Sequence, residues 1–547
     1  MGKNENRCRA KERPFSDLIY PRDGGEVFVG FVCPIGTDEQ SVAEDVQAAF
    51  ASHGYKVVRI KLSDYLRDRL KGTRDLDKLS YFDRTSMLQD EGNSLRRAYG
   101  NDILARLAVI DLAQRRAEEG DSRKGPQRIA YFFRSLKHPE EAILLRTLYG
   151  HGFYLFALSS DFDRRVSNLM SRDMRKKKAV SLIRRDERQG EDHQQNTRDT
   201  FELADFYLND ESSMAEPAKR FVRLIFGDLQ QTPTRDEYGM NLATVASFRS
   251  GDLARQVGAA VIDHCGDVIA LGCNEVPKSG GGLYWAGDNP DGRDAVFGYD
   301  PNDHEKSERL KRFQQILRRN HKSITKEQIQ DAFVSSRLKD ITEFGRTVHA
   351  EMDAITSCSR RGVSTLGHTI YVTTFPCHNC ARHIVASGLE KVVFIEPYPK
   401  SIAVELHSDS IICRSHSPSG HPRRGGKNRV EFLPFVGVAP RRYSDFFGVR
   451  NLSGRRLERK DSGYARKFSI EDLKAPRFRL TELPYLKREE LLMVTSHLEG
   501  VDLCGDRKSE TLKRILKYWR DQPLRMKKFS EEEEMIFKRL QDEVEVG

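Results

Sequence analysis

The chain of 547 residues has no apolar run that approaches the roughly 18 residues needed to span a bilayer. Its charged first residues are not followed by the apolar core of a signal peptide, and Asn6 stands where a myristoylation pattern requires Ser or Thr. The nine cysteines are scattered and odd in number, so disulfides are not expected. These absences predict a cytoplasmic protein without a membrane partner.

The composition excludes further classes of protein. It is 38% hydrophobic, 31% charged and 9% aromatic, which argues against disordered and fibrous chains. The net charge of +10 would suit an anionic partner such as a nucleotide or a nucleic acid. However, 91 basic against 81 acidic residues is a modest excess that fits an ordinary surface equally well. Charge therefore leaves the partner open.

Short apolar segments alternate with helical patterns in the first 230 residues, which predicts a doubly wound α/β domain over 26–228 after a polar leader of 1–25. Strands are expected at 26–32, 55–60, 129–133 and 153–158, and helical runs at 41–51 and 95–115. The basic run 164–188 predicts a solvated helix or a flap. Residues 229–240 are expected to form a linker.

A second α/β unit is expected over 241–413, followed by a C-terminal extension of 414–547. Its predicted elements are a hairpin of 259–263 and 268–272, a loop of 279–303, a charged helical stretch of 304–340, helices beginning near 348 and 377, and strands at 369–373 and 391–395. The extension begins with a loop at 414–430 and ends in an acidic helix. No internal repeat is visible.

The strongest chemical pattern is an H-x-E triplet, His349 and Glu351, followed by P-C-x-x-C with Cys377 and Cys380. Two cysteines three positions apart share one side of a first helical turn, where thiolates are favoured. Two thiolates and one imidazole give zinc three ligands and leave a fourth position for water, which then loses a proton near neutral pH. We predict a catalytic Zn²⁺ at these three ligands, with Glu351 as the general acid and base.

This pattern resembles the zinc-dependent cytidine and deoxycytidylate deaminase superfamily. Residues 255–260 (RQVGAA) resemble the TQVGAV segment of deoxycytidylate deaminases, and 272–275 (GCNE) resemble their GYNG stretch, whose Asn contacts the sugar 3′-hydroxyl. The resemblance implies a CMP/dCMP-type α/β/α zinc deaminase domain over 241–413. It assigns Asn274 to substrate binding, with a turn-holding role as the alternative. Arg255 is a candidate phosphate contact or a surface ion pair.

The chain departs from a minimal nucleoside deaminase between Asn274 and His349, which are 75 positions apart. The insert contains Tyr284 and Trp285, whose rings either stack on a base or pack in a lid.

Residues 26–228 resemble a P-loop nucleotide kinase, including the run SLKHPEE at 135–141. The phosphate loop would extend from Gly30 through Gly36 and Thr37, and these three residues are predicted to hold a regulatory nucleotide through backbone N–H groups. A purely structural domain is the alternative.

Two catalytic parts of such a kinase are missing. No Lys or Arg occurs between Val27 and Tyr55, and Glu39 stands where the loop lysine belongs. Arg134 ends the third predicted strand, where kinases carry a magnesium-binding Asp. We therefore expect no phosphoryl transfer.

The order of these domains, with PFVGVAPRRY at 434–443, resembles the bacterial anti-phage deoxycytidylate deaminases. That resemblance implies deamination of dCTP and dCMP, depletion of dCTP during infection, a homo-oligomer that is often a hexamer, and in some members an inhibitory small RNA. Three alternatives remain: a housekeeping dCMP deaminase for thymidylate supply, an RNA or DNA cytidine deaminase, and a sensor with an inactive site.

Overall fold

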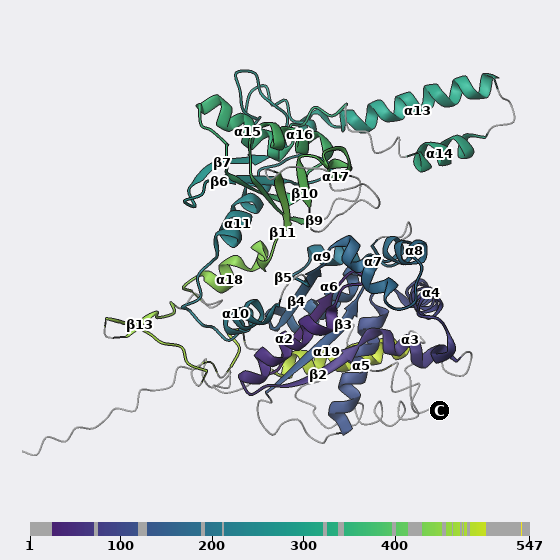
Figure 1. Ribbon diagram of the computed structural model, residues 1–547. Helices are drawn as coiled ribbons and strands as arrows, with labels where there is room; N and C mark the ends of the chain where they lie inside the picture. The colour runs from purple at the N-terminus through teal and green to yellow at the C-terminus, as the bar shows by residue number, and fades with distance from the viewer. Residues whose placement is uncertain are drawn as a thin grey trace, which may run out of the picture. The chain divides into compact units, whose positions relative to one another are not determined.

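The computed structural model describes residues 25–70, 75–118, 128–187, 192–210, 213–320, 325–336, 344–396, 401–413, 429–450, 456–461, 463–470, 473, 475–478, 482–498 and 538 (Figure 1). The chain divides into two compact units. The first comprises Met1–Ser160, Arg164–Thr232 and Ser444–Gly547, and the second Asp161–Asp163 and Pro233–Tyr443. Among the described residues, no helix combines the length and apolar character that crossing a membrane requires.

The first unit is built on a parallel sheet in which neighbouring strands follow the order β5-β4-β1-β3-β2. The strands are β1 (Val27–Val32), β2 (Lys56–Lys61), β3 (Ile129–Leu136), β4 (Phe153–Ser159) and β5 (Phe206–Asn209). β1 lies at the centre and is buried along its whole length. Helical crossovers connect these strands, as parallel pairing requires. The predicted doubly wound α/β architecture and its first four strands are confirmed.

The helices of this unit are α2 (Glu39–Ser52), α3 (Leu62–Leu70), α4 (Tyr81–Tyr99), α5 (Ile103–Glu118), α6 (Pro139–Tyr149), α7 (Phe162–Met170), α8 (Lys176–Glu187), α9 (Thr197–Glu202), α10 (Ala215–Ile225) and α19 (Glu482–Leu498). The expectation of one helical run over 95–115 is wrong, because Gly100, with φ of +101°, ends α4. Within the basic run 164–188, α7 ends at Met170 and α8 extends from Lys176 to Glu187, where it buries Leu182 and Ile183.

Part of the predicted C-terminal extension completes the first unit. Helix α19 packs against α5 and α6. The ring of Tyr485 contacts the rings of Phe28 and Tyr149, and its hydroxyl donates to Glu26 Oε2 at 2.6 Å. Tyr149 in turn donates to the buried carboxylate of Glu489 at 2.7 Å. The predicted leader up to residue 24, the loop at 414–428 and nearly all of the acidic C-terminal end lie outside the described residues.

The second unit contains a mixed sheet with the strand order β10-β11-β9-β8-β6-β7. Its strands are β6 (Gly258–Ile262), β7 (Val268–Cys273), β8 (Thr369–Thr374), β9 (Lys391–Glu396), β10 (Ile411–Cys413) and β11 (Val430–Pro434). The predicted hairpin is confirmed as the antiparallel pair β6–β7. β6 pairs antiparallel with β8, whereas β8, β9, β11 and β10 are parallel.

Two glycines show how helices cover both faces of this sheet. A Cβ on Gly258 would lie 1.8 Å from the carbonyl oxygen of Ala243 in α11 (Arg235–Ser247), and one on Gly272 would lie 2.2 Å from that of Ala350 in α15 (Ala350–Arg361). Gly272 pairs with Ala259, the neighbour of Gly258, so the two glycines face opposite sides. The predicted α/β/α arrangement is confirmed for this unit.

Helix α11 begins inside 229–240, the range predicted as linker. Thr234 and Glu237 form a capping box that fixes its start, and Glu237 is fully buried. Hydrophobic periodicity therefore placed the boundary several residues too late, because it did not include the capping signal. The insert before His349 contains α12 (Asp294–Phe297), α13 (Pro301–Asn320) and α14 (Lys326–Ser335), of which α13 and α14 extend away from the sheet (Figure 1).

The remaining elements are short. They are α16 (His378–Ala386), α17 (Ala403–Leu406), α18 (Tyr443–Phe447), β12 (Gly437–Val438), β13 (Lys460–Asp461), β14 (Tyr464–Ala465) and the 3₁₀ turns at Leu76–Lys78, Gly150–Gly152 and Pro440–Arg442.

We predict that Tyr485→Ala lowers the free energy of unfolding by about 3 kcal/mol, because the substitution empties an aromatic contact inside the first unit. Tyr464→Ala is the matched control: its ring is 82% exposed, so a change within about 0.5 kcal/mol is expected. Urea denaturation of the full chain measures both. Equal effects of the two substitutions would show that α19 does not belong to this core.

Candidate active site

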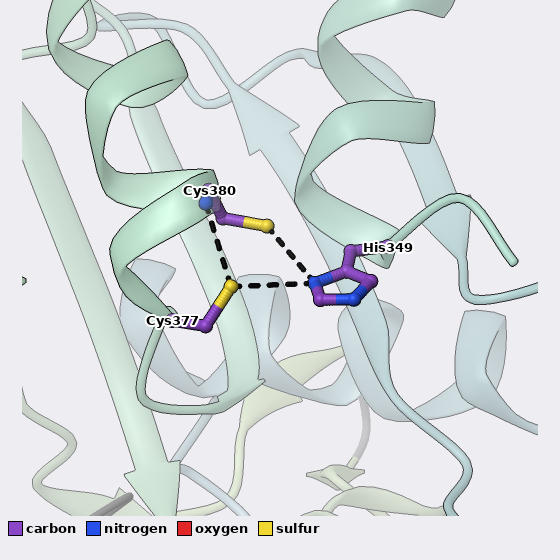
Figure 2. A group of neighbouring side chains, drawn as sticks. All are labelled: His349, Cys377 and Cys380. Carbon is purple, nitrogen blue, oxygen red and sulfur yellow. Dashed lines mark hydrogen bonds between the residues drawn. The ribbon is translucent and has the colours of Figure 1, made fainter. Parts of the chain in front are cut away.

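The side chains of His349, Cys377 and Cys380 converge from two helix starts in the second unit. His349 is the N-cap of α15, and Cys377 is the N-cap of α16. Figure 2 shows the His349 ring facing both sulfurs, with Nδ1 at 3.4 Å from Cys377 Sγ and 3.3 Å from Cys380 Sγ. Their ligand atoms all lie within 4.8 Å of one another. The structure thus brings together the three predicted metal ligands.

This geometry fits zinc. A tetrahedral ion with Zn–S of about 2.3 Å and Zn–N of about 2.0–2.1 Å separates its nitrogen and sulfur ligands by about 3.6 Å. The observed contacts of 3.3–3.4 Å are close to that separation. Three protein ligands leave one position open, which is typical of catalytic zinc. Bound there, zinc would supply a water of lowered pKa.

Glu351 lies within the first turn of α15, two residues after the histidine ligand, and is 4% exposed. Its carboxyl shares a hydrogen bond with the Cys380 thiol, so it borders the ligand group. Burial raises the pKa of Glu351 above its ordinary value. A buried carboxyl next to an open ligand position can take up and release protons there, as predicted for the acid–base residue.

The electrostatics of the ligand group favour a thiolate. Hydrogen bonds with Cys380 and His349 lower the pKa of Cys377 to about 4, and the backbone N–H of Cys380 also donates to Cys377 Sγ at 3.5 Å. The contact with Cys377 raises the pKa of His349 to about 9. Zinc binds thiolates and neutral imidazole, so metal binding must displace the protons that these groups carry.

Two contacts that the sequence did not reveal hold the segments directly before the ligands in place. Glu275 and Val348 form an antiparallel bridge, with N–H···O distances of 3.2 and 3.0 Å, immediately before His349. On the other side, the hydroxyl of Ser401 donates to the carbonyl of Pro376 at 2.8 Å, directly before Cys377. Both contacts join segments far apart in sequence, so no local pattern could have indicated them.

Asn274 is buried and its amide holds the neighbouring segment. Its Oδ1 accepts from Val257 N at 2.7 Å, and its Nδ2 donates to the carbonyl of Arg255 at 2.7 Å. The turn-holding role is thus present. An asparagine amide offers two acceptor and two donor positions, so one of each remains. The substrate-binding role of Asn274 stays a prediction.

Arg255 forms the ion pair that was its alternative role. Its guanidinium contacts Glu396 and lies 3.4 Å from Thr374 Oγ1, at the ends of β9 and β8. Thr374 also donates to Glu396 at 2.7 Å. Since β8 leads into the turn that carries Cys377, Arg255 lies at the same edge of the sheet as the metal ligands. Its phosphate contact stays a prediction.

Of the two aromatic residues of the insert, Tyr284 contacts its own loop and Trp285 contacts Arg249 from outside it. A Cβ on Gly292 would lie 2.7 Å from the ring of Tyr284, so ring and backbone are in close contact. The guanidinium of Arg249 stacks on Trp285 with 3.6 Å to the ring centroid. Trp285 borders a cavity of about 420 Å³ whose lining includes Lys278 and Arg360. The contact of Tyr284 favours the packing role, whereas Trp285 is 59% exposed and its role stays a prediction.

Gly30, Gly36 and Thr37, which are predicted to bind a nucleotide, do not all lie in one loop of the structure. Gly30 lies inside β1 and pairs with both β3 and β4, so its backbone is in the sheet and cannot bind an anion. This corrects the predicted start of the phosphate loop. Gly36 and Thr37 lie in the turn before α2, where Thr37 N donates to the carbonyl of Pro34 at 3.2 Å. Nucleotide binding at Gly36 and Thr37 stays a prediction.

Residues 233–396 match the sequence model of the cytidine and deoxycytidylate deaminase zinc-binding region. ComE operon protein 2 of Bacillus subtilis (strain 168) is 49% identical over 53 residues, which make up 10% of this chain and 28% of that protein. The deoxycytidylate deaminase of Enterobacteria phage T2 is 46% identical over 54 residues, 10% of this chain and 29% of that enzyme. The chain thus spans less than a third of the length of these two curated relatives.

A solved structure, dCMP deaminase from the cyanophage S-TIM5 in apo form, aligns with a TM-score of 0.21 and 16% identity over 38% of this chain and 100% of that chain. The match of residues 233–396 includes all three ligands and Glu351. Residues 233–396 therefore carry the zinc-binding region of cytidine and deoxycytidylate deaminases, and Zn²⁺ is the cofactor that this region implies.

We predict that Cys377→Ala and Cys380→Ala each abolish stoichiometric zinc, because three protein ligands are the minimum for such a site. Cys358→Ala is the control, since Cys358 is buried in α15 but outside the ligand group. Zinc content after dialysis against a chelator, measured by mass spectrometry, distinguishes them. Unchanged zinc in both ligand variants would remove this group as the metal site.

Proposed function

We propose that this chain hydrolyses the exocyclic amine of a free deoxycytidine nucleotide, dCMP, dCTP or both, to give the deoxyuridine nucleotide and ammonia. The observation that carries the proposal is the buried group of His349, Cys377 and Cys380 with Glu351 beside it. The name of the phage T2 relative, deoxycytidylate deaminase, supports the substrate class.

The reaction needs one water and two proton transfers. The oxygen of water forms a bond to C4 of the cytosine ring, and the bond from C4 to the amine breaks. Glu351 is placed to accept the two protons of water in turn: it passes the first to the ring nitrogen and the second, released as the oxygen on C4 becomes a carbonyl, to the leaving amine. Because its pKa is raised by burial, the protonated state needed for the second part is accessible.

A free nucleotide is favoured over a nucleic acid by the residues around Asn274. The remaining donor and acceptor of its amide would bind the sugar 3′-hydroxyl, which a continuing strand would not offer. Arg255 would exchange Glu396 for the substrate phosphate, since guanidinium matches phosphate geometry. Arg255 precedes β6 and Asn274 follows β7, and the hydrogen bond from Asn274 to the Arg255 carbonyl joins these two segments.

For the physiological role, we propose depletion of dCTP in anti-phage defence. The support is the domain order of the chain, whose first unit is not needed for supplying thymidylate precursors. Housekeeping deamination of dCMP is the second candidate, and the deoxycytidylate deaminase relative supports it equally. The homo-oligomer, the regulatory nucleotide and the inhibitory small RNA stay predictions.

The substrate experiment incubates purified, zinc-loaded full-length protein with dCMP, dCTP, CMP, CTP and short DNA and RNA oligonucleotides, and measures uracil products. Turnover of dCMP or dCTP at least about 10²-fold above the oligonucleotides is expected, because a site that pairs with a free 3′-hydroxyl strongly rejects substrates in which that hydroxyl is esterified. The proposed substrate class also requires that dCMP or dCTP be turned over faster than CMP and CTP. Turnover only of oligonucleotides would contradict the proposal. Among the free nucleotides, turnover of dCMP alone would favour the housekeeping role.

We predict that Glu351→Gln retains zinc and lowers kcat by at least about 10²-fold, because the amide cannot transfer protons. Glu390→Gln makes the same change on an exposed residue of the same unit and should leave kcat unaltered. Steady-state assays with dCMP and dCTP, paired with zinc analysis, test this. A Glu351→Gln enzyme with normal turnover would assign acid–base chemistry to another residue.

A further inference from the structure

The turn between β1 and α2, residues 33–38, is hereafter the P-loop-like turn. It stands where a P-loop protein binds phosphate, after a central strand and before a helix. Two of its backbone N–H groups already donate to carboxylates of the chain. Ile35 N donates to Asp186 Oδ2 at 2.8 Å, and Asp38 N donates to Asp210 Oδ2 at 3.0 Å. Asp186 comes from α8, and Asp210 directly follows β5.

A lysine reaches the same turn from a distant part of the sequence. Lys137 follows β3, and its Nζ donates to the carbonyl of Cys33 at 2.6 Å while lying 2.8 Å from Asp186 Oδ1. Two residues before Lys137, within β3, Ser135 adopts a φ of +68°, which is uncommon for a residue other than glycine. The ammonium that the sequence motif lacks is therefore supplied by the chain after all, but together with a carboxylate that neutralises it.

Glu39 and Arg134, whose charges are opposite to those that a P-loop kinase carries at the same positions, form an ion pair with each other. Glu39, where the loop lysine was expected, accepts from Arg134, where a magnesium-binding carboxylate was expected, at 2.7 Å. Arg134 also donates to Gln40 at 2.9 Å. Because they pair with each other, Arg134 is not available to bind phosphate and Glu39 is not available to bind a metal.

Neighbouring helices enclose the P-loop-like turn. Asn168 and Arg165, both in α7, donate to the carbonyls of Gly36 and Ile35 at 2.9 Å each. The side chain of Asp186 is 1% exposed and that of Lys137 is 15% exposed. Burial by itself lowers the pKa of Lys137, but Asp186 raises it above its ordinary value, so the pair is ionic. Removing only one partner of such a buried ion pair strongly destabilises the folded protein, because the other charge is left buried and unpaired.

We propose that the P-loop-like turn is an internally occupied anion site, in which Asp186 takes the place of a phosphate group and Lys137 that of the loop lysine. Asp186 thereby holds α8 closed over the turn. An external phosphate competes directly with this carboxylate, and the site accepts one only when Asp186 leaves. A regulatory nucleotide at this turn would consequently have to displace α8.

The test measures binding of pyrophosphate to full-length protein by equilibrium dialysis at fixed ionic strength. The wild-type protein should bind it weakly, whereas Asp186→Ala should bind at least tenfold more tightly, because Lys137 and Ile35 N lose their internal anion. Adding Lys137→Met to Asp186→Ala should abolish that gain. Any second phosphate site is common to all variants and drops out of the comparison.

Asp90→Asn is the matched control, because it removes an ion pair between α4 and Arg185 of the same helix α8 without touching the turn. It should bind pyrophosphate like the wild type. Pyrophosphate should also raise the melting temperature of Asp186→Ala and leave that of the wild type unchanged. If the alanine variant does not fold, Asp186→Asn, which preserves side-chain volume, should show at least a threefold gain in affinity. A folded variant with no gain, or wild-type binding as tight as that of the variant, would overturn the proposal.

Discussion

The candidate metal site of the second unit depends on one contact, that of His349 Nδ1 with the sulfurs of Cys377 and Cys380. His349 and Cys377 both precede their helices as N-caps, so each side chain projects from a helix start instead of lying along a helix side. Packing of α15 against α16 brings these two starts together. A shift of either helix by one residue would carry a ligand out of reach, since successive residues on a helix point in different directions. The close packing at Gly272 fixes α15 against the sheet and so limits such a shift.

Asn274 and Arg255, which are predicted to contact the substrate, also connect the segments around the site. Asn274 ties two backbone positions together, and Arg255 joins the ends of two strands through Glu396. A nucleotide entering there would have to use the remaining amide positions of Asn274 and replace one carboxylate at Arg255. Structural and binding roles need not exclude each other at these positions, because a polar group with several donor or acceptor positions can serve both.

In the first unit, too, side chains of the chain itself occupy the groups that a ligand would bind. Its P-loop-like turn contains the geometry of an anion site and, in the same volume, the carboxylate that satisfies it. Its core likewise closes with a helix from near the other end of the described chain, whose Glu489 is buried against Tyr149. Buried polar groups in proteins are almost always paired, and here the partners come from segments 49 to 340 positions away.

Local sequence indicated strands β1–β4 and β6–β9, helices α2, α13, α14, α15 and α16, and the predicted zinc ligands with Glu351, but it did not indicate β5, β10 or β11. These features depend on periodicity, on capping residues and on the chemistry of residue types at short spacing, all of which are written in neighbouring positions. Local patterns failed where a single signal was overlooked, as at Gly100 in the predicted 95–115 helix and at the Thr234 capping box. Tertiary structure alone decided that α19 belongs to the first unit and that Asn274 clamps the 255–257 segment. It also decided that Lys137 and Asp186 meet in the turn after β1. Such pairings join residues distant in sequence, and they depend on how whole elements pack, which no short window of residues encodes.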